Sequence, residues 1–158
     1  MTTINERMRE LGITLPPPPP AAASYVQTRL ASLGGGRSLI YIAGQISREG
    51  DKVLMGRCPD QVSVEEATRR ARLCGLSVLS QIEAAVGLDS VLEVTQLIGF
   101  VLSADGFGEQ PKVMNGASEL LVEVLGAAGK HTRAALGANA LPFSATVEVA
   151  AVAVVSTV

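Results

Sequence analysis

Aromatic residues are scarce in this sequence, and tryptophan is absent. Phe, Trp and Tyr make up only 3% of the 158 residues, although 47% of them are hydrophobic. Proteins that bind single-stranded nucleic acid stack the bases on aromatic rings, so this composition argues against a nucleic-acid partner. A hydrophobic core must instead be packed from Val, Leu, Ile and Ala on sheets and helices.

Excess positive charge is missing as well. The 13 Lys and Arg residues are outnumbered by 15 Asp and Glu residues, which gives a net charge of −2. Proteins drawn to phosphate backbones or anionic lipids carry a basic excess. No uncharged apolar stretch approaches the roughly 18 residues of a membrane span, and the N-terminus lacks the apolar region of a secretory signal. We therefore expect a cytoplasmic protein without membrane association, whose partners are small molecules or proteins.

Cysteine and histidine are too few for a disulfide framework or a metal site. Cys58 and Cys74 lie 16 positions apart with no second pair, so we expect two reduced thiols and no bound metal. His131 is the only histidine, and it lacks a partner for a metal site or a catalytic triad. We expect it to be a solvent-exposed loop residue; the alternative is an acid in a ligand cleft.

The length of the chain fits a single domain with an N-terminal extension. Thr3 and Glu6 form a capping-box pattern, which predicts a short amphipathic helix that ends before Gly12. The run from Pro16 to Pro20 lacks backbone donors and favours an extended polyproline II conformation. We expect residues 1–23 to form a helix and a proline-rich arm, and residues 24–158 to form the domain.

From residue 25 on, the pattern becomes that of a sheet with two long helices. The glycines at positions 34–36 predict a hairpin turn rather than a phosphate loop, because no Lys-Ser or Lys-Thr pair follows them. A second capping-box pattern, Ser63 and Glu66, opens the stronger helix, whose arginines at 69, 70 and 72 we expect on a solvated face. This order predicts an α+β fold with both helices on one face of a single sheet. The predicted strands are 25–30, 38–42, a short one near 53, 91–102, 133–138 and 145–155, and the predicted helices are 63–87 and 111–126.

The last predicted strand is apolar at every position from 147 to 155 except Glu148. Such a strand needs cover on both faces. One face can pack on the two helices, whereas the chain has no further helix for the other. We therefore expect self-association through the open face of the sheet.

Arg133 and Glu148 are the only charged residues after Lys130. A carboxylate inside an apolar strand is costly to desolvate unless it has hydrogen-bonding or cationic partners. One interpretation is a structural ion pair within the chain, and another is that Glu148 faces water at a sheet edge. The third is that both side chains belong to a ligand site.

Several short stretches resemble, in the same order along the chain, the signature of the Rid family (reactive intermediate deaminases, also called YjgF-like or L-PSP-like proteins). The resemblance covers roughly residues 25–155. The matching stretches are Ser24-Tyr25-Val26-Gln27, Gly44-Gln45-Ile46, Asn115, Thr132-Arg133-Ala134-Ala135-Leu136, Leu141-Pro142 and Val147-Glu148-Val149.

The resemblance implies a chorismate-mutase-like fold and a homotrimer whose sheets pack into a central barrel, with three clefts between adjacent subunits. It also implies hydrolysis of small 2-imino acids, which are enamine or imine intermediates, to 2-oxo acids and ammonia without a cofactor. Carried over to this chain, Arg133 would clamp the substrate carboxylate and Glu148 would orient or activate the attacking water. The backbone carbonyl of Ala135 would help to hold that water. The residues expected to line the cleft are Tyr25, Gly44 and Asn115.

The chain departs from the family pattern at three places. It has Ala43 where the deaminating branch usually has Ser, Ala135 where Cys is frequent, and Lys130-His131-Thr132 where small residues or Pro are usual. The lost hydroxyl at Ala43 leaves open a second function, that of a non-catalytic subunit that binds a small carboxylate. A third function, ribonuclease or translation inhibitor, has no basic groove or histidine pair to support it.

Overall fold

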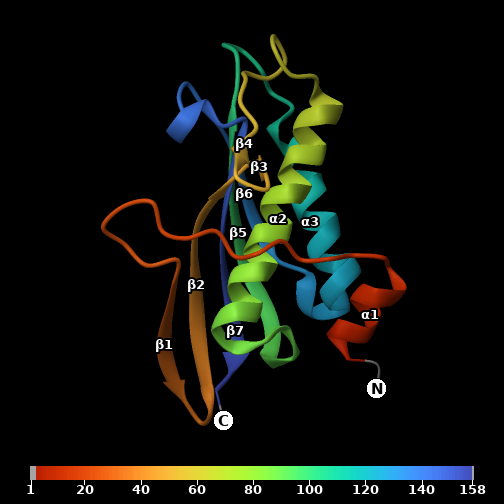
Figure 1. Ribbon diagram of the computed structural model, residues 1–158, viewed down its shortest axis with the longest axis vertical. Helices are drawn as coiled ribbons and strands as arrows, with labels where there is room; N and C mark the ends of the chain where they lie inside the picture. Colours follow the sequence, from red (N-terminus) through yellow and green to blue (C-terminus); the bar gives the residue numbers. More distant parts are fainter. Residues whose placement is uncertain (1–2, 158) are drawn as a thin grey trace.

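A computed structural model describes residues 3–157 of the chain, and its main element is a five-stranded sheet with the order β1-β2-β7-β5-β6 (Figure 1). All neighbouring strands are antiparallel except β5 and β6, which are parallel. A separate hairpin, β3 (Arg48–Glu49) and β4 (Lys52–Val53), contains the short strand expected near residue 53. The strands of the main sheet are β1 (Thr28–Gly34), β2 (Arg37–Ile46), β5 (Val91–Leu102), β6 (Thr132–Ala138) and β7 (Val147–Ser156).

Two long helices, α2 (Val64–Val86) and α3 (Gln110–Leu125), pack side by side on one face of this sheet (Figure 1). Each helix ends at a glycine with positive φ, Gly87 and Gly126, a conformation that stops a helix at little steric cost. The α+β fold with one main sheet and both helices on one face is therefore confirmed.

The first strand begins three residues later than predicted. Its expected start, Tyr25, lies in a turn in which the Tyr25 N–H donates to the Ala23 carbonyl at 2.9 Å. The reason is the preceding proline run, because Gln27 holds the Pro20 carbonyl at 2.8 Å and fixes the chain before Thr28 can pair with β2. The glycine turn of the hairpin is as predicted.

The core lies between the sheet and the two helices. In β7 the buried residues alternate with half-buried ones, so one face of this strand packs on the helices and the other faces away from them. Two large apolar side chains on that open face, Tyr41 and Leu136, are 47% and 48% exposed. A single chain thus leaves apolar surface on the sheet, as the sequence led us to expect.

The N-terminal segment packs on the domain instead of projecting from it. Helix α1 (Ile4–Glu10) has the predicted capping box at Thr3, and Met8 is 6% exposed within the core. The proline run then crosses the outer side of α2, where Ser80 donates to the Pro16 carbonyl and Gln81 donates to the Pro19 carbonyl at 2.7 Å (Figure 1). The proline-rich arm is therefore held against α2 by side chains of that helix.

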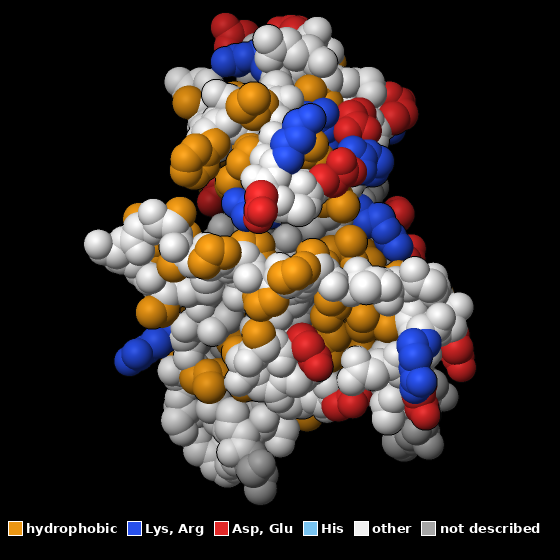
Figure 2. All heavy atoms as spheres, viewed as in Figure 1, with side chains coloured by type: hydrophobic (Ala, Val, Ile, Leu, Met, Phe, Trp, Pro, Cys, Tyr) orange, Lys and Arg blue, Asp and Glu red, His pale blue; other side chains and the backbone are white. Residues whose placement is uncertain are grey.

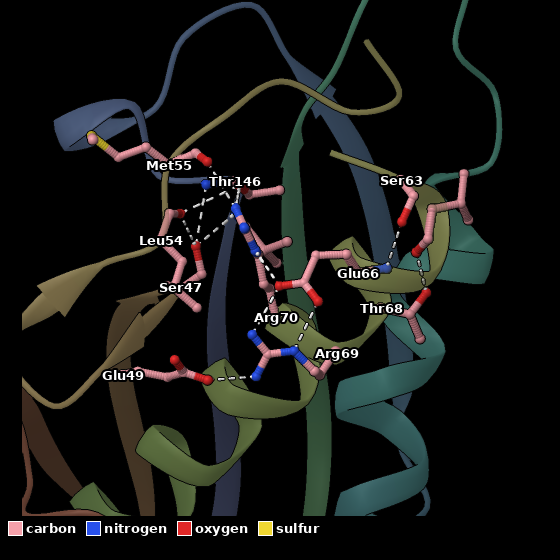
Figure 3. Close-up of polar contacts among 12 residues, drawn as sticks. Ser47, Glu49, Leu54, Met55, Ser63, Glu66, Thr68, Arg69, Arg70 and Thr146 are labelled. Carbon is pink, nitrogen blue, oxygen red and sulfur yellow. Dashed lines mark hydrogen bonds and ion pairs between the residues drawn. The ribbon is translucent and has the colours of Figure 1, made fainter. Parts of the chain in front are cut away.

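The arginines of α2 do not all lie on a solvated face, so that prediction is wrong for Arg70. Its side chain is only 14% exposed and donates to Thr146 at 2.7 Å, to the Met55 carbonyl at 2.8 Å and to Glu66 at 2.9 Å (Figure 3). The second predicted capping box is half wrong for the same reason. Ser63 accepts from the Glu66 N–H at 3.1 Å, but the Glu66 carboxylate binds Arg69 and Arg70 instead of the Ser63 backbone.

Charges of both signs lie next to one another along the upper half of the surface in Figure 2, whereas apolar side chains follow the middle of that face. Arg69 forms ion pairs with Glu49 and Glu66, and Arg72 forms an ion pair with Glu123 at 2.7 Å. Both cysteines are buried and free, and burial raises the pKa of the Cys74 thiol. None of the helices within residues 3–157 is long and apolar enough to cross a membrane.

Candidate functional site: two half-sites on opposite faces of the sheet

Arg133 and Glu148 lie on opposite faces of the sheet. Arg133 is the register partner of Leu97, which is fully buried beneath the helices. Glu148 is the register partner of Phe100, whose side chain points to the other face because successive residues of β5 alternate. A structural ion pair between the two within one chain is thereby ruled out. Glu148 also does not face water at an edge, since β7 is the central strand.

Helix α3 holds the Arg133 guanidinium. One terminal nitrogen, Nη1, donates to Asn115 Oδ1 at 2.9 Å and to Ser118 Oγ at 3.1 Å, and the other, Nη2, donates to the Pro111 carbonyl at 3.1 Å. Three of the five N–H groups of this side chain are therefore used. Nε–H and one N–H of Nη2 have no partner among residues 3–157. Because Nε and Nη2 share one edge of the planar group, that edge can take a carboxylate in a bidentate manner.

His131 is connected to this arrangement, and the expectation of a solvent-exposed loop residue is wrong. Its side chain is half-buried, with Nδ1 2.6 Å from the Gly129 carbonyl and Nε2 2.9 Å from Ser118 Oγ. The same Ser118 oxygen accepts from Arg133. The physical reason is the tight turn at Gly126–Gly129, which brings the residue before β6 back against α3.

Glu148 is half-buried on the open face and has no ion pair among the residues that the structure describes. Burial raises the pKa of its carboxyl group. Its carboxylate lies over Gly44 of β2, where any side chain would overlap it. A glycine at position 44 therefore gives this carboxylate its space, although Gly44 itself has an ordinary backbone conformation.

A cleft of about 460 Å³ opens in front of Glu148. Gly44 and Tyr25 line it, and so do Pro19 and Pro20 of the N-terminal arm. Three glutamines attach the arm to the sheet and to α2. Gln27 donates to the Pro20 carbonyl and Gln45 donates to Gln27, both at 2.8 Å, and Gln81 of α2 donates to the Pro19 carbonyl. Gln45 and Gln81 are 2% and 5% exposed, so these amides link the arm, β2 and α2 inside the protein.

Phe143 also lines the cleft, from the connection between β6 and β7. It is 66% exposed and has φ +55°, a conformation that a bulky residue adopts rarely and at a cost of roughly 1–3 kcal/mol. The next residue, Ser144, has φ +56°. Two of the five aromatic residues of the chain, Tyr25 and Phe143, thus border this one cleft.

The six site residues suggested by the resemblance form two groups. Tyr25, Gly44 and Glu148 share the cleft on the open face. Asn115 contacts Arg133, and Ala135 follows it by two residues in β6, where it packs against the core. The structure brings the members of each group together but does not bring the two groups together in one chain.

Sequence reasoning missed the residues that support each group. Ser118 and the buried pair Gln45 and Gln81 were not singled out as site residues, because polar residues in a helix or strand are usually solvated. A signal was available for Gln81, since it lies between the apolar residues Leu79 and Ile82 on a helix with an apolar stripe. For Ser118 the sequence offers no comparable signal.

Comparisons with known proteins agree with this fold. The chain matches the family model described as "YjgF/chorismate_mutase-like, putative endoribonuclease" over residues 7–155, a range that includes the proline run. Protein TCP17 of Trypanosoma cruzi is 37% identical to it over 145 residues, which are 90% of this chain and 88% of that protein.

Among solved structures, the protein Atu1372 from Agrobacterium tumefaciens, of unknown function, has a TM-score of 0.84 and 40% identity, covering 98% of this chain and 94% of that one. E. coli TdcF with bound serine has a TM-score of 0.58 and 25% identity, covering 87% of this chain and 93% of that one. The extent of the family match and the identity to these relatives show that this chain belongs to the YjgF/chorismate mutase-like family.

Proposed function

We propose that this protein hydrolyses small 2-imino acids to 2-oxo acids and ammonia without a cofactor, in clefts formed between the subunits of a homotrimer. The observation that carries the proposal is the arrangement of Arg133. Three acceptors on α3 orient its guanidinium and leave the Nε and Nη2 edge for a ligand carboxylate. E. coli TdcF, a relative in fold, has been crystallised with serine, which carries the same α-carboxylate.

Glu148 would act on water. Burial raises the pKa of its carboxyl group, which makes the ionised form a stronger base than an exposed glutamate. The attack of water on the C=N carbon forms a C–O bond, and loss of ammonia from that carbon then leaves the 2-oxo acid. Glu148 would take one proton from the water and pass it to the imine nitrogen, which gives a carbinolamine. It would then take the hydroxyl proton of the carbinolamine and pass it to the same nitrogen, so that the C–N bond breaks and ammonia leaves. The backbone carbonyl of Ala135 would help to hold the water.

The proposed site needs a second subunit because one chain separates the two groups, and the family resemblance suggests a homotrimer. Arg133 faces α3, whereas Glu148 faces the open side of the sheet. A cleft that contains both must receive Arg133 and Asn115 from one subunit and Tyr25, Gly44 and Glu148 from its neighbour. The apolar open face supplies a surface on which the sheets of three subunits can pack into a barrel.

The decisive assay measures release of 2-oxo acid and ammonia from freshly generated 2-iminopropanoate. Arg133→Ala should abolish the enzymatic rate because the carboxylate loses its anchor, and Glu148→Gln should lower kcat by about 10²–10⁴-fold because no base remains. Leu33→Ala, which removes an exposed side chain at the hairpin tip, is the matched control and should keep full activity. A wild-type rate no higher than that of buffer would refute the enzymatic proposal.

A second candidate is a non-catalytic subunit that binds a 2-oxo acid or a similar carboxylate. It is favoured by Ala43, which lines the cleft without a hydroxyl to contact the substrate. Saturable pyruvate binding that is lost in Arg133→Ala, with no imine turnover, would select this function. Ribonuclease activity, named in the family description, has no support in the net charge of −2 or in the lining of the cleft, where Arg48 is the only basic residue.

A further inference from the structure

We propose that His131 and Ser118 are positioning residues that hold the Arg133 guanidinium in the orientation that binds a carboxylate. The inference rests on the proposed function in one respect, namely that Arg133 is the carboxylate anchor. His131 touches neither the cleft in front of Glu148 nor the free edge of the guanidinium, so it acts through Ser118.

The direction of each hydrogen bond follows from which atoms carry protons. The Gly129 carbonyl can only accept, so the 2.6 Å contact with His131 requires the imidazole proton to lie on Nδ1. In a neutral ring Nε2 is then an acceptor. Arg133 Nη1 donates to Ser118 Oγ at 3.1 Å, and the single proton of that hydroxyl is left for His131 Nε2 at 2.9 Å. All three groups therefore have one consistent assignment.

We call the hydrogen bonds that link Arg133, Ser118, His131 and the Gly129 carbonyl the relay. It affects the orientation of Arg133 because a serine hydroxyl can rotate about its C–O bond. Without an acceptor for its proton, Ser118 can turn its O–H toward the guanidinium, and two donors would then face each other. His131 Nε2 accepts the Ser118 proton and so keeps the O–H pointed away from the guanidinium. The Gly129 carbonyl accepts from Nδ1 and so selects the tautomer in which Nε2 is the acceptor. The orientation of Arg133 is thus connected to the protein backbone through two side chains.

The backbone end of this relay has little freedom to move. Gly129 is buried, and a side chain at this position would clash with the Leu121 carbonyl of α3. Only glycine lets the turn approach the helix backbone so closely. The Gly129 carbonyl therefore occupies a fixed position relative to α3, which also carries Ser118 and Asn115.

Pyruvate binding by calorimetry tests the inference. His131→Phe keeps a ring but removes the acceptor, and we expect the Kd for pyruvate to rise by roughly tenfold. His131→Gln places a side-chain oxygen near the position of Nε2 and should restore most of the affinity. Ser118→Ala should weaken binding as much as His131→Phe does, and the double variant should be no worse than either. In the imine assay these variants should raise KM much more than they lower kcat, since Glu148 is unaffected.

Because His131 is the only histidine, nitrogen NMR of the imidazole reads its tautomer without assignment of other rings. At alkaline pH we expect the proton on Nδ1, with the Nε2 resonance shifted in Ser118→Ala. A proton on Nε2, or a Kd for His131→Phe equal to that of wild type, would overturn the inference and leave Arg133 as the anchor. If wild type and Arg133→Ala both fail to bind pyruvate, the proposed function falls and the inference falls with it.

Discussion

Among single residues, Arg133 and Glu148 lie on opposite faces of the sheet and differ in how the protein surrounds their charges. Arg133 has three protein acceptors and an unoccupied edge, whereas Glu148 is half-buried without a cation among residues 3–157. A desolvated carboxylate favours its protonated form. The protein thus provides three hydrogen-bond acceptors for Arg133, whereas the hydrogen bonds of the Glu148 carboxylate must come from water or a ligand.

This difference predicts how Glu148 affects stability. Because burial raises its folded pKa above the ordinary value of 4.5, the native state binds more protons than the unfolded state as pH rises through 4.5 toward the folded pKa. Stability therefore falls over that window and stays lower above it. Glu148→Gln should raise the Tm at neutral pH, and the gain should vanish at a pH well below 4.5, where the carboxyl is protonated in both states.

Thermal unfolding at several pH values checks this, with Glu93→Gln on β5 as a control at an exposed position. A gain in Tm that persists at a pH well below 4.5 would contradict this explanation, because the carboxyl group is then protonated in both states.

Among the helices and strands, the local sequence pattern was enough to predict the bounds of segments that no distant side chain disturbs. Residues 91–102 form β5 as predicted, because alternating β-branched and apolar residues specify a buried strand. The prediction failed where distant segments interfere. Pro20 displaces the start of β1 through Gln27, and Arg70 takes the carboxylate that was expected to complete the second capping box.

The Arg70 side chain connects α2 with the segments around Met55 and Thr146. Its removal should therefore lower the free energy of unfolding much more than the removal of Arg69. Arg70→Ala removes the arginine donor of Thr146 and of the Met55 carbonyl and one of the two arginines that bind Glu66, and we expect a loss of about 2–3 kcal/mol in the free energy of unfolding. Arg69→Ala removes ion pairs of a side chain that is 46% exposed and should cost less than about 1 kcal/mol. Urea unfolding of both variants measures the difference; equal losses would contradict the account.

For the whole molecule, the sequence was enough to identify the fold, but it did not show that the predicted site residues are divided between two faces of the sheet. Whether a residue points to one face or the other depends on the register between strands, and β5 to β7 pairs residues about 50 positions apart. The opposite placement of Arg133 and Glu148 therefore could not be predicted from local pattern. The strand register determines this placement, because it pairs Arg133 with Leu97 and Glu148 with Phe100.

If each cleft takes Arg133 from one subunit and Glu148 from another, mixing two inactive variants should restore activity. Arg133→Ala and Glu148→Gln subunits, unfolded together in equal amounts and refolded, would form mixed assemblies. Mass spectrometry of tagged subunits would verify that they form. Random assembly gives about one cleft in four an intact pair, so we predict recovery of roughly a quarter of the wild-type imine hydrolysis. Mixed assemblies no more active than either variant alone would contradict the claim.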